Sequence, residues 1–196
     1  DRSDEAFLSG VRRIFDGARC ETDLLTTDEP GGGPSFGFAC DFARANAGDL
    51  IYLVEDDYLH DEAAILEMVR SFERLSALCK KDVVLFPTDY PDVYRHVYPT
   101  YVVPGSHRHW RSIEDTTMTM MLSRRTLVKY WDAISPLRKY GIDPGITEAS
   151  TVGSMYRTSV PCFSPLPSLA VHMGEVENIS LYADWRSWWR QSAVAD

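Results

Sequence analysis

The sequence predicts an α/β fold with one mostly parallel sheet flanked by helices. Amphipathic helical stretches alternate with short apolar runs over the first 89 residues, a rhythm typical of parallel sheets. A chain of 196 residues is long enough to bury one sizeable core. Its hydrophobic share of 44% and charged share of 25% are those of an ordinary globular protein. We therefore expect a single domain over 1–196, regular in 1–89 and irregular in 90–196.

Charge and cysteine usage exclude several classes of protein. The net charge of −9 argues against a nucleic-acid binder that relies on a broad basic surface. The four cysteines are scattered without a CxxC pair, so we expect neither a zinc cluster nor a redox motif. They are typical of buried thiols in a reducing compartment, which predicts a cytoplasmic protein. No apolar run reaches about 18 residues, so we expect no transmembrane segment.

The expected elements of the first half follow from apolar spacing and from breakers. A helix to about residue 15 begins after the capping residues Ser3 and Asp4. A strand over 21–27 ends at Asp28, and glycines and a proline at 31–34 form a loop. A helix over 35–46 stops at Ala47 and Gly48. A strand over 50–54, a helix over 61–78 and a strand over 83–86 complete this half.

The second half is less regular. We expect a long loop or hairpin at 90–110, a strand at 116–122, a helix at 124–134, a connection at 135–145 and a helix at 146–156. Pro165 and Pro167 make 162–171 at best an interrupted or edge strand. A short helix at 182–191 is rich in tryptophan and arginine. It either packs on the core or makes a peripheral contact with a membrane.

Three consecutive carboxylates end the apolar run at 50–54 and are the most informative feature of the chain. Glu55, Asp56 and Asp57 repel one another unless a cation lies between them. Ligands of open α/β sheets bind beyond the carboxyl ends of the strands. A divalent metal that carries a phosphate-bearing substrate is the simplest candidate. The alternative is an acidic loop that caps the next helix.

These pieces together resemble GT-A glycosyltransferases related to family 2. The order is a strand ending in Asp28, a small-residue loop, a helix, an apolar strand and then the acids at 55–57, which look like a variant of the acidic DxD motif. Later segments resemble one subset of the family: 109–110, 116–119, 164–167 leading to His172, Glu175 and 184–185. Two departures stand out. The strand that normally precedes the opening helix is missing, and the first acid is Glu55. We therefore expect the chain to be part of a longer protein.

The resemblance implies a donor-binding half at 1–89 and an acceptor-side half at 90–196. It implies transfer of a sugar from a nucleoside diphosphate, with UDP favoured over GDP or dTDP, to a hydroxyl of a glycan or lipid-linked acceptor, with inversion. The cofactor is Mn²⁺ or Mg²⁺, held by Asp57 and His172, while Glu55 and Asp56 contact the donor ribose or metal-bound water. Oxygen ligands suit both ions, and one imidazole favours Mn²⁺.

Each further candidate site residue also has a purely structural interpretation. Glu148 is the candidate general base and Asp143 the second choice, although a first-turn acid also stabilises a helix. Asp28 faces the donor base or simply caps a turn. Trp110 stacks on a sugar or is a partly buried aromatic. Thr117 lines the donor and acceptor pocket or is a residue of a strand.

Two rival functions stay open at this point. Another metal-dependent phosphate enzyme, such as a nucleotidyltransferase or phosphohydrolase, also places acids at strand ends. A non-catalytic nucleotide- or carbohydrate-binding module can retain the same fold. Loss of turnover in Glu148→Gln and Asp57→Ala separates an enzyme from a binding module.

Overall fold

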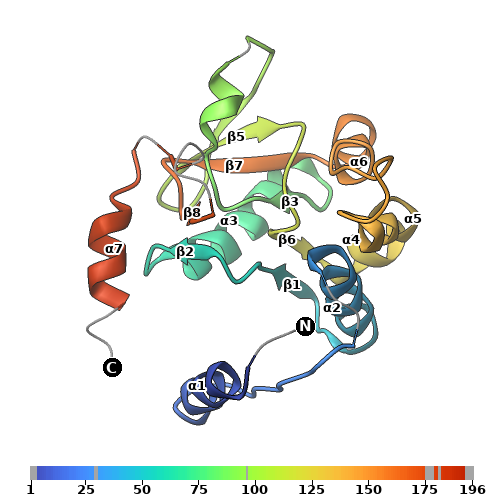
Figure 1. Ribbon diagram of the computed structural model, residues 1–196. Coiled ribbons are helices and arrows are strands. Elements are labelled where there is room, and N and C mark those ends of the chain that lie inside the picture. Colours follow the sequence, from blue (N-terminus) through green and yellow to red (C-terminus); the bar gives the residue numbers. More distant parts are fainter. Residues whose placement is uncertain (1–3, 29–30, 96, 175–178, 181, 193–196) are drawn as a thin grey trace.

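The computed structural model describes residues 4–28, 31–95, 97–174, 179–180 and 182–192. Its centre is a six-stranded sheet with helices on both faces, which confirms the α/β class (Figure 1). In spatial order the strands are β1 (Leu50–Leu53), β6 (Met120–Ser123), β3 (Val84–Leu85), β7 (Cys162–Leu166), β5 (His109–Ile113) and β4 (Val102–Pro104).

The expectation of a mostly parallel sheet is wrong. The sheet is mixed, and among the strands that the structure describes only β3 and β7 pair in parallel. Strand β6 comes from the second half of the chain and lies antiparallel between β1 and β3. Strand β5 lies antiparallel to both β7 and β4. The prediction assumed that consecutive strands are neighbours, whereas strands of the two halves interleave.

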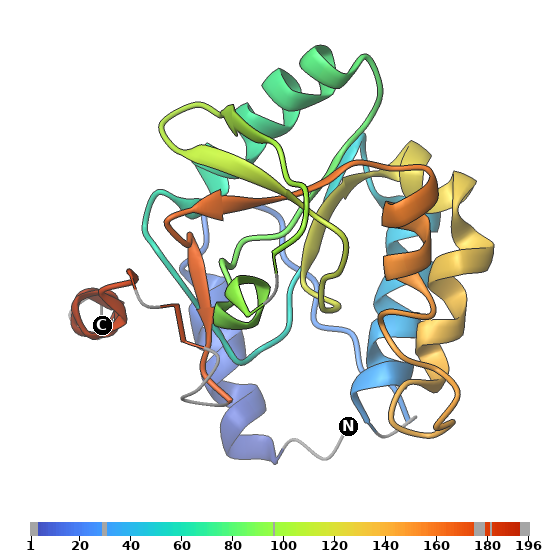
Figure 2. The same cartoon turned by 90° about the horizontal axis from the view of Figure 1, so that it is seen from above.

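Helices cover the two faces of this sheet unequally. On one side, α2 (Gly32–Asn46), α4 (Arg124–Lys129), α5 (Trp131–Ile134) and α6 (Val152–Thr158) stand together, and on the other side lies α3 (Ala64–Cys79) (Figure 2). Each side has its own hydrophobic cluster. Phe36 and Met120 belong to the α2 side, and Met68 and Met121 to the α3 side. Neighbouring residues of β6 thus face opposite clusters, as alternation along a strand requires.

The predicted strand at 21–27 is wrong. Helix α1 (Glu5–Asp16) forms as expected, with the side chain of Asp4 accepting a hydrogen bond from the backbone of Phe7. It buries none of its residues and stands apart from the sheet (Figure 1). Residues 21–26 are exposed, and none of the described strands pairs with them. Without a partner for its backbone groups, an extended segment does not form a strand.

Two further boundaries differ because glycine and turn chemistry were misjudged. The expected glycine loop at 31–34 is the first turn of α2, with Gly31 as its N-cap at a positive φ of 108°. The expected helix at 146–156 begins only at Val152. Before it, Thr147 and Ser150 bond to each other's backbone and form a turn that replaces the first helical turn.

The segment at 162–171 is an interrupted strand, as one of the two expectations had it, and not an edge strand. Strand β7 occupies a central place between β3 and β5, with Pro165 in register opposite Trp110. The pairs on either side of the proline hold the register, although the ring removes one donor. The chain then forms β8 (Ala170–His172), which pairs antiparallel with β2 (Tyr58–His60).

The remaining elements are short. Two 3-10 helices, η1 (Pro91–Tyr94) and η2 (Ser135–Lys139), lie in the irregular half. Helix α7 (Trp185–Ser192) buries none of its residues and lies beside β2 (Figure 1). Among the described residues, no helix has both the length and the apolar character needed to cross a membrane.

Candidate functional site

The acids that follow β1 lie at the carboxyl end of that strand, and Thr119, the residue before β6, holds the first of them. The backbone N–H of Glu55 donates to the hydroxyl of Thr119 at 3.1 Å, and that hydroxyl donates to the Glu55 carboxylate at 3.0 Å. Burial raises the pKa of Glu55, although the bond from Thr119 opposes the change. The sequence thus placed Glu55 correctly at a strand end, but gave no sign of its Thr119 partner.

Asp57 and His172 lie together, as the resemblance implied. Their side chains meet because β2 pairs with β8, which sets Tyr58 opposite His172. His172 Nε2 lies 2.8 Å from Asp57 Oδ2, and the backbone of Met173 donates to the Asp57 carbonyl. The other ring nitrogen, Nδ1, is buried and has no hydrogen-bond partner within the described part of the chain. The contact joins residues 115 positions apart.

This pair fits a divalent cation by the chemistry of its donors. A carboxylate oxygen and an imidazole nitrogen are both ligands of Mn²⁺, and Mg²⁺ also accepts the oxygen. No set of three His, Cys, Asp or Glu side chains in the described ranges is grouped closely enough to hold a metal ion. A two-residue site is compatible with an ion that takes its other ligands from substrate phosphates and water.

Two cavities meet at this cluster. The first, which we call the α2 cavity, has a volume of about 840 Å³ and lies between the start of α2 and the acids. It is lined by Gly31, Gly32, Ser35, Phe36, Ala39, Leu53, Val54, Glu55, Asp56, Asp57 and Met118. The second, the Glu148 cavity, measures about 440 Å³ and extends toward η1 and α6. Glu55 and Met118 line both, so the two cavities adjoin.

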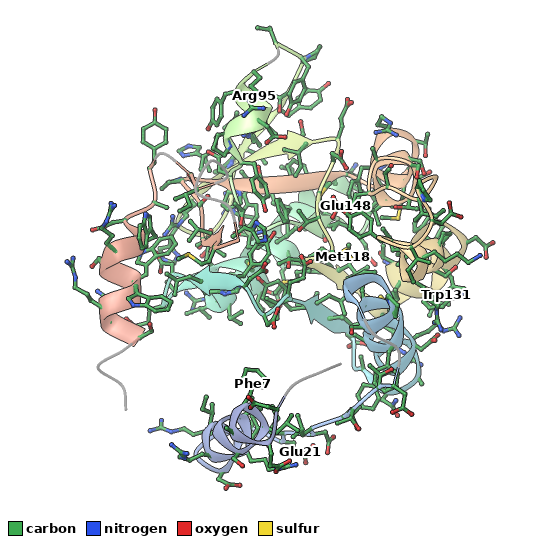
Figure 3. All side chains as sticks on the ribbon, in the orientation of Figure 1. Phe7, Glu21, Arg95, Met118, Trp131 and Glu148 are labelled. Atoms are coloured by element: carbon green, nitrogen blue, oxygen red, sulfur yellow. The ribbon has the colours of Figure 1, made fainter. Side chains whose placement is uncertain are left out.

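Glu148 is the most perturbed carboxyl group of the second cavity. Burial, followed by the negative charges of Asp115 and Glu55, raises its pKa to about 8. A hydrogen bond from the Met118 backbone opposes the change only in part. Figure 3 shows Glu148 on the loop before α6, with Met118 close by in the view. A carboxyl group with this pKa takes up a proton readily near neutral pH, as a general base must.

Thr117 also lies in the Glu148 cavity, where it belongs to a hydroxyl network. The hydroxyl of Tyr58 lies 2.9 Å from those of both Thr117 and Tyr90. The Tyr90 ring in turn stacks on Phe86, with 5.5 Å between the ring centroids. The network fixes the aromatic wall of the cavity.

The structure does not bring three of the predicted residues to the site. Asp28 and Asp143 are exposed and line neither cavity. The Asp143 carboxylate accepts a hydrogen bond from the backbone of Gly145, which is a turn interaction. Trp110 is fully buried, so stacking of its ring on a sugar is wrong. Glu175 lies outside the described residues.

Trp110 instead belongs to a structural cluster around Glu67. This buried carboxylate accepts hydrogen bonds from the Trp110 ring, the Ser71 hydroxyl and the backbone of 106–108. A carboxylate with several donors anchors a loop strongly. The cluster sits on the α3 side of the sheet, away from both cavities.

Sequence reasoning gave no site role to Asp115 or Ser164, which line the Glu148 cavity. Asp115 follows β5 by two residues, so the rule that drew attention to Glu55 also applied to it. Ser164 lies within β7, and the resemblance covered it only as the first residue of the segment 164–167, with no role for its hydroxyl.

Comparison with known proteins gives no match: no family model, no curated protein and no solved structure matches this chain. The function is therefore inferred from the site itself, together with the resemblance of its motifs.

Proposed function

We propose that this chain is a metal-dependent glycosyltransferase domain of the GT-A type. It moves a sugar from a nucleoside-diphosphate donor to a hydroxyl group of a glycan or glycolipid acceptor. The observation that carries the proposal is the joint placement of Asp57, His172 and Glu55 where two cavities adjoin, with Glu148 in the second cavity. One cavity for the donor and one for the acceptor, side by side, is what group transfer between two substrates needs.

The α2 cavity suits the donor diphosphate. Its wall includes Gly31 and Gly32 at the start of α2, where backbone N–H groups and the helix dipole favour an anion. The opposite wall carries Asp56 and Asp57, which repel a diphosphate unless a cation intervenes. A bound nucleotide and a bound metal therefore require each other at this site.

Asp57 and His172 are the residues that would hold the metal. When bound, Mn²⁺ or Mg²⁺ acts as a Lewis acid that stabilises the charge developing on the departing diphosphate. The hydrogen bond between Asp57 and His172 fixes both side chains before any ligand arrives, which lowers the cost of ordering them.

Glu148 serves the acceptor. Its carboxylate takes the proton from the acceptor hydroxyl, whose oxygen forms a bond to the anomeric carbon while the bond from that carbon to the diphosphate oxygen breaks. Attack from the second cavity on a sugar held in the first inverts the anomeric centre. Because the base must be ionised, the transfer rate should rise with pH toward the pKa of about 8.

Calorimetric titration tests the donor site first. UDP, GDP and dTDP are titrated with and without Mn²⁺ into the wild type, Asp57→Ala and the control Asp132→Ala, whose side chain is exposed on α5. We expect one nucleotide to bind only with Mn²⁺, and only Asp57→Ala to weaken it, by about tenfold or more. Failure of every nucleotide to bind, with or without Mn²⁺, overturns the proposal.

Release of nucleotide from sugar donors then separates an enzyme from a binding module. Many transferases slowly transfer the sugar to water, so no acceptor is needed. We expect Glu148→Gln to slow release by about a hundredfold, with unchanged nucleotide affinity. Equal rates in Glu148→Gln and wild type would remove Glu148 from the mechanism.

A further inference from the structure

The Glu148 cavity is lined by more acidic than basic side chains. Four carboxyl groups line it: Glu55, Asp92, Asp115 and Glu148. One arginine, Arg95, also lines it but is exposed, and the His172 ring is hydrogen-bonded to Asp57. In Figure 3, Arg95 extends from the η1 region and lies well apart from Glu148.

Asp115 and Glu148 form the inner part of this acidic lining. Each has a raised pKa, for which burial is the main cause in both, and the Asp115 charge adds to the effect on Glu148. Asp115 keeps one local hydrogen bond, from the backbone of Thr116. The Arg157 charge favours ionisation of Asp115, but the Arg157 guanidinium donates to the Ala149 carbonyl.

Ser164 provides an independent sign that this cavity is a binding site. It is 1% exposed and lines the same cavity, and its hydroxyl has no hydrogen-bond partner within the described residues. Its backbone lies within β7, paired with Arg111 of β5, so the side chain is the part that faces the cavity. A buried hydroxyl without a hydrogen-bond partner destabilises the empty cavity, and a ligand hydroxyl that bonds to it would remove this cost.

The walls of the cavity are aromatic. Tyr58, Phe86, Tyr90 and Tyr140 line it, and the Phe86–Tyr90 stack and the Tyr58–Tyr90 hydrogen bond hold three of these rings in place. Ring faces attract organic cations, and fixed rings lose little entropy on binding.

We propose that the Glu148 cavity binds an acceptor sugar that carries a protonated amino group, with the ammonium beside Asp115 and a sugar hydroxyl on Ser164. This specificity rests on the proposed transferase function, because it names the acceptor of the same site. Aromatic walls next to paired carboxylates suit an organic ammonium better than a divalent metal, which prefers a shell of oxygen ligands.

The bound amine also changes how readily Glu148, the proposed base, ionises. A positive charge beside Asp115 offsets the repulsion that Asp115 exerts on Glu148, so Glu148 ionises more readily once the acceptor is bound. A neutral sugar in the same place leaves that repulsion intact. The site thereby favours the correct acceptor both in binding and in proton removal.

Binding of simple glycosides to the full chain tests this inference. Methyl β-glucosaminide, its N-acetylated form and methyl β-glucoside are titrated below the pKa of the amine, followed by calorimetry or by ligand NMR. We expect the charged glycoside to bind about tenfold more tightly than either neutral one. Asp115→Asn should abolish this preference, whereas the control Asp132→Asn should keep it.

Two other variants keep the test decisive. Ser164→Ala should weaken the charged and neutral glycosides alike, because it removes a hydrogen bond that does not depend on charge. Glu148→Gln should reduce the preference for the amine, and it serves if Asp115→Asn does not fold. Equal binding of charged and neutral glycosides, absence of any binding, or displacement of the amine by Mn²⁺ from the Asp115 site would each overturn the inference.

The two proposals fail separately. Nucleotide binding with Mn²⁺ but no amine preference removes only the acceptor specificity. An amine preference that depends on Asp115, in a protein that binds no nucleotide, marks the cavity as an amine site and removes the transferase.

Discussion

Replacement of Glu148 by glutamine should make the protein less sensitive to alkaline pH. Glu148 has an ordinary pKa of 4.5 in the unfolded chain and a pKa of about 8 in the folded protein. Between these values the folded state keeps a proton that the unfolded chain releases. The free energy of unfolding therefore falls as pH rises through this range and levels off above about pH 8.

The size of the effect follows from the difference between the two pKa values. Each pKa unit corresponds to about 1.4 kcal/mol, which gives a ceiling of roughly 5 kcal/mol for complete burial. Solvent in the open cavity screens part of this cost, so we expect about 2 kcal/mol. Glutamine retains an oxygen that accepts the hydrogen bond from the Met118 backbone. The increase in the free energy of unfolding of Glu148→Gln over wild type therefore measures the effect of the charge alone.

Urea denaturation at a series of pH values measures this directly. The difference in free energy of unfolding between Glu148→Gln and wild type should grow by about 2 kcal/mol from pH ~5 to pH ~9. For the control Glu62→Gln, a change at an exposed residue, the difference from wild type should not vary with pH. A flat difference for Glu148→Gln as well would mean that this carboxyl group ionises normally, and would refute its role as a poised base.

Three further predictions concern the Glu67 cluster. Gly105→Ala should destabilise the fold by about 3 kcal/mol in thermal denaturation. The added Cβ would lie 2.3 Å from the Trp110 ring and 2.5 Å from Ser71 Oγ. Gly48→Ala is the control, because the space around Gly48 is open. Glu67→Gln should cost about 2 kcal/mol in urea denaturation. Burial acts to raise the Glu67 pKa, but hydrogen bonds from Ser71, Trp110 and His107 lower it overall below its ordinary 4.5. The wild-type advantage should therefore decline as pH falls below 4.5 and be lost as pH passes the lowered pKa. Trp110→Phe should lower stability but leave nucleotide affinity in calorimetry unchanged, and a tenfold loss of affinity would return Trp110 to the site.

Local patterns predicted the elements well where apolar periodicity was strong. The helices at 35–46 and 61–78 and the strand at 50–54 all exist, with ends displaced by a few residues. The neighbours of each strand were not predictable in the same way. The residues of a strand such as β6 do not show that it will lie between β1 and β3, because strand pairing depends on contacts with residues distant in the sequence.

The candidate site shows the same division. Glu55, Asp57 and Glu148 stand out in the sequence because charge follows an apolar run or opens a helix. Trp110 misled the prediction because its neighbours are polar, whereas its ring bonds to Glu67 in the core. Ser164 lies in a segment that the resemblance covered, but its role could not be predicted, since a buried hydroxyl without a partner is a property of packing alone.

The pairing of β2 with β8 has a consequence for the order of folding. The Asp57–His172 contact spans 115 positions. Strand β1 also stays without its partner until β6, from the second half of the chain, pairs with it. Contacts between such distant residues form slowly, because a long loop must close before any gain is made. During synthesis the first ninety or so residues therefore emerge with uncovered apolar strands, and the site is completed only when His172 has also left the ribosome.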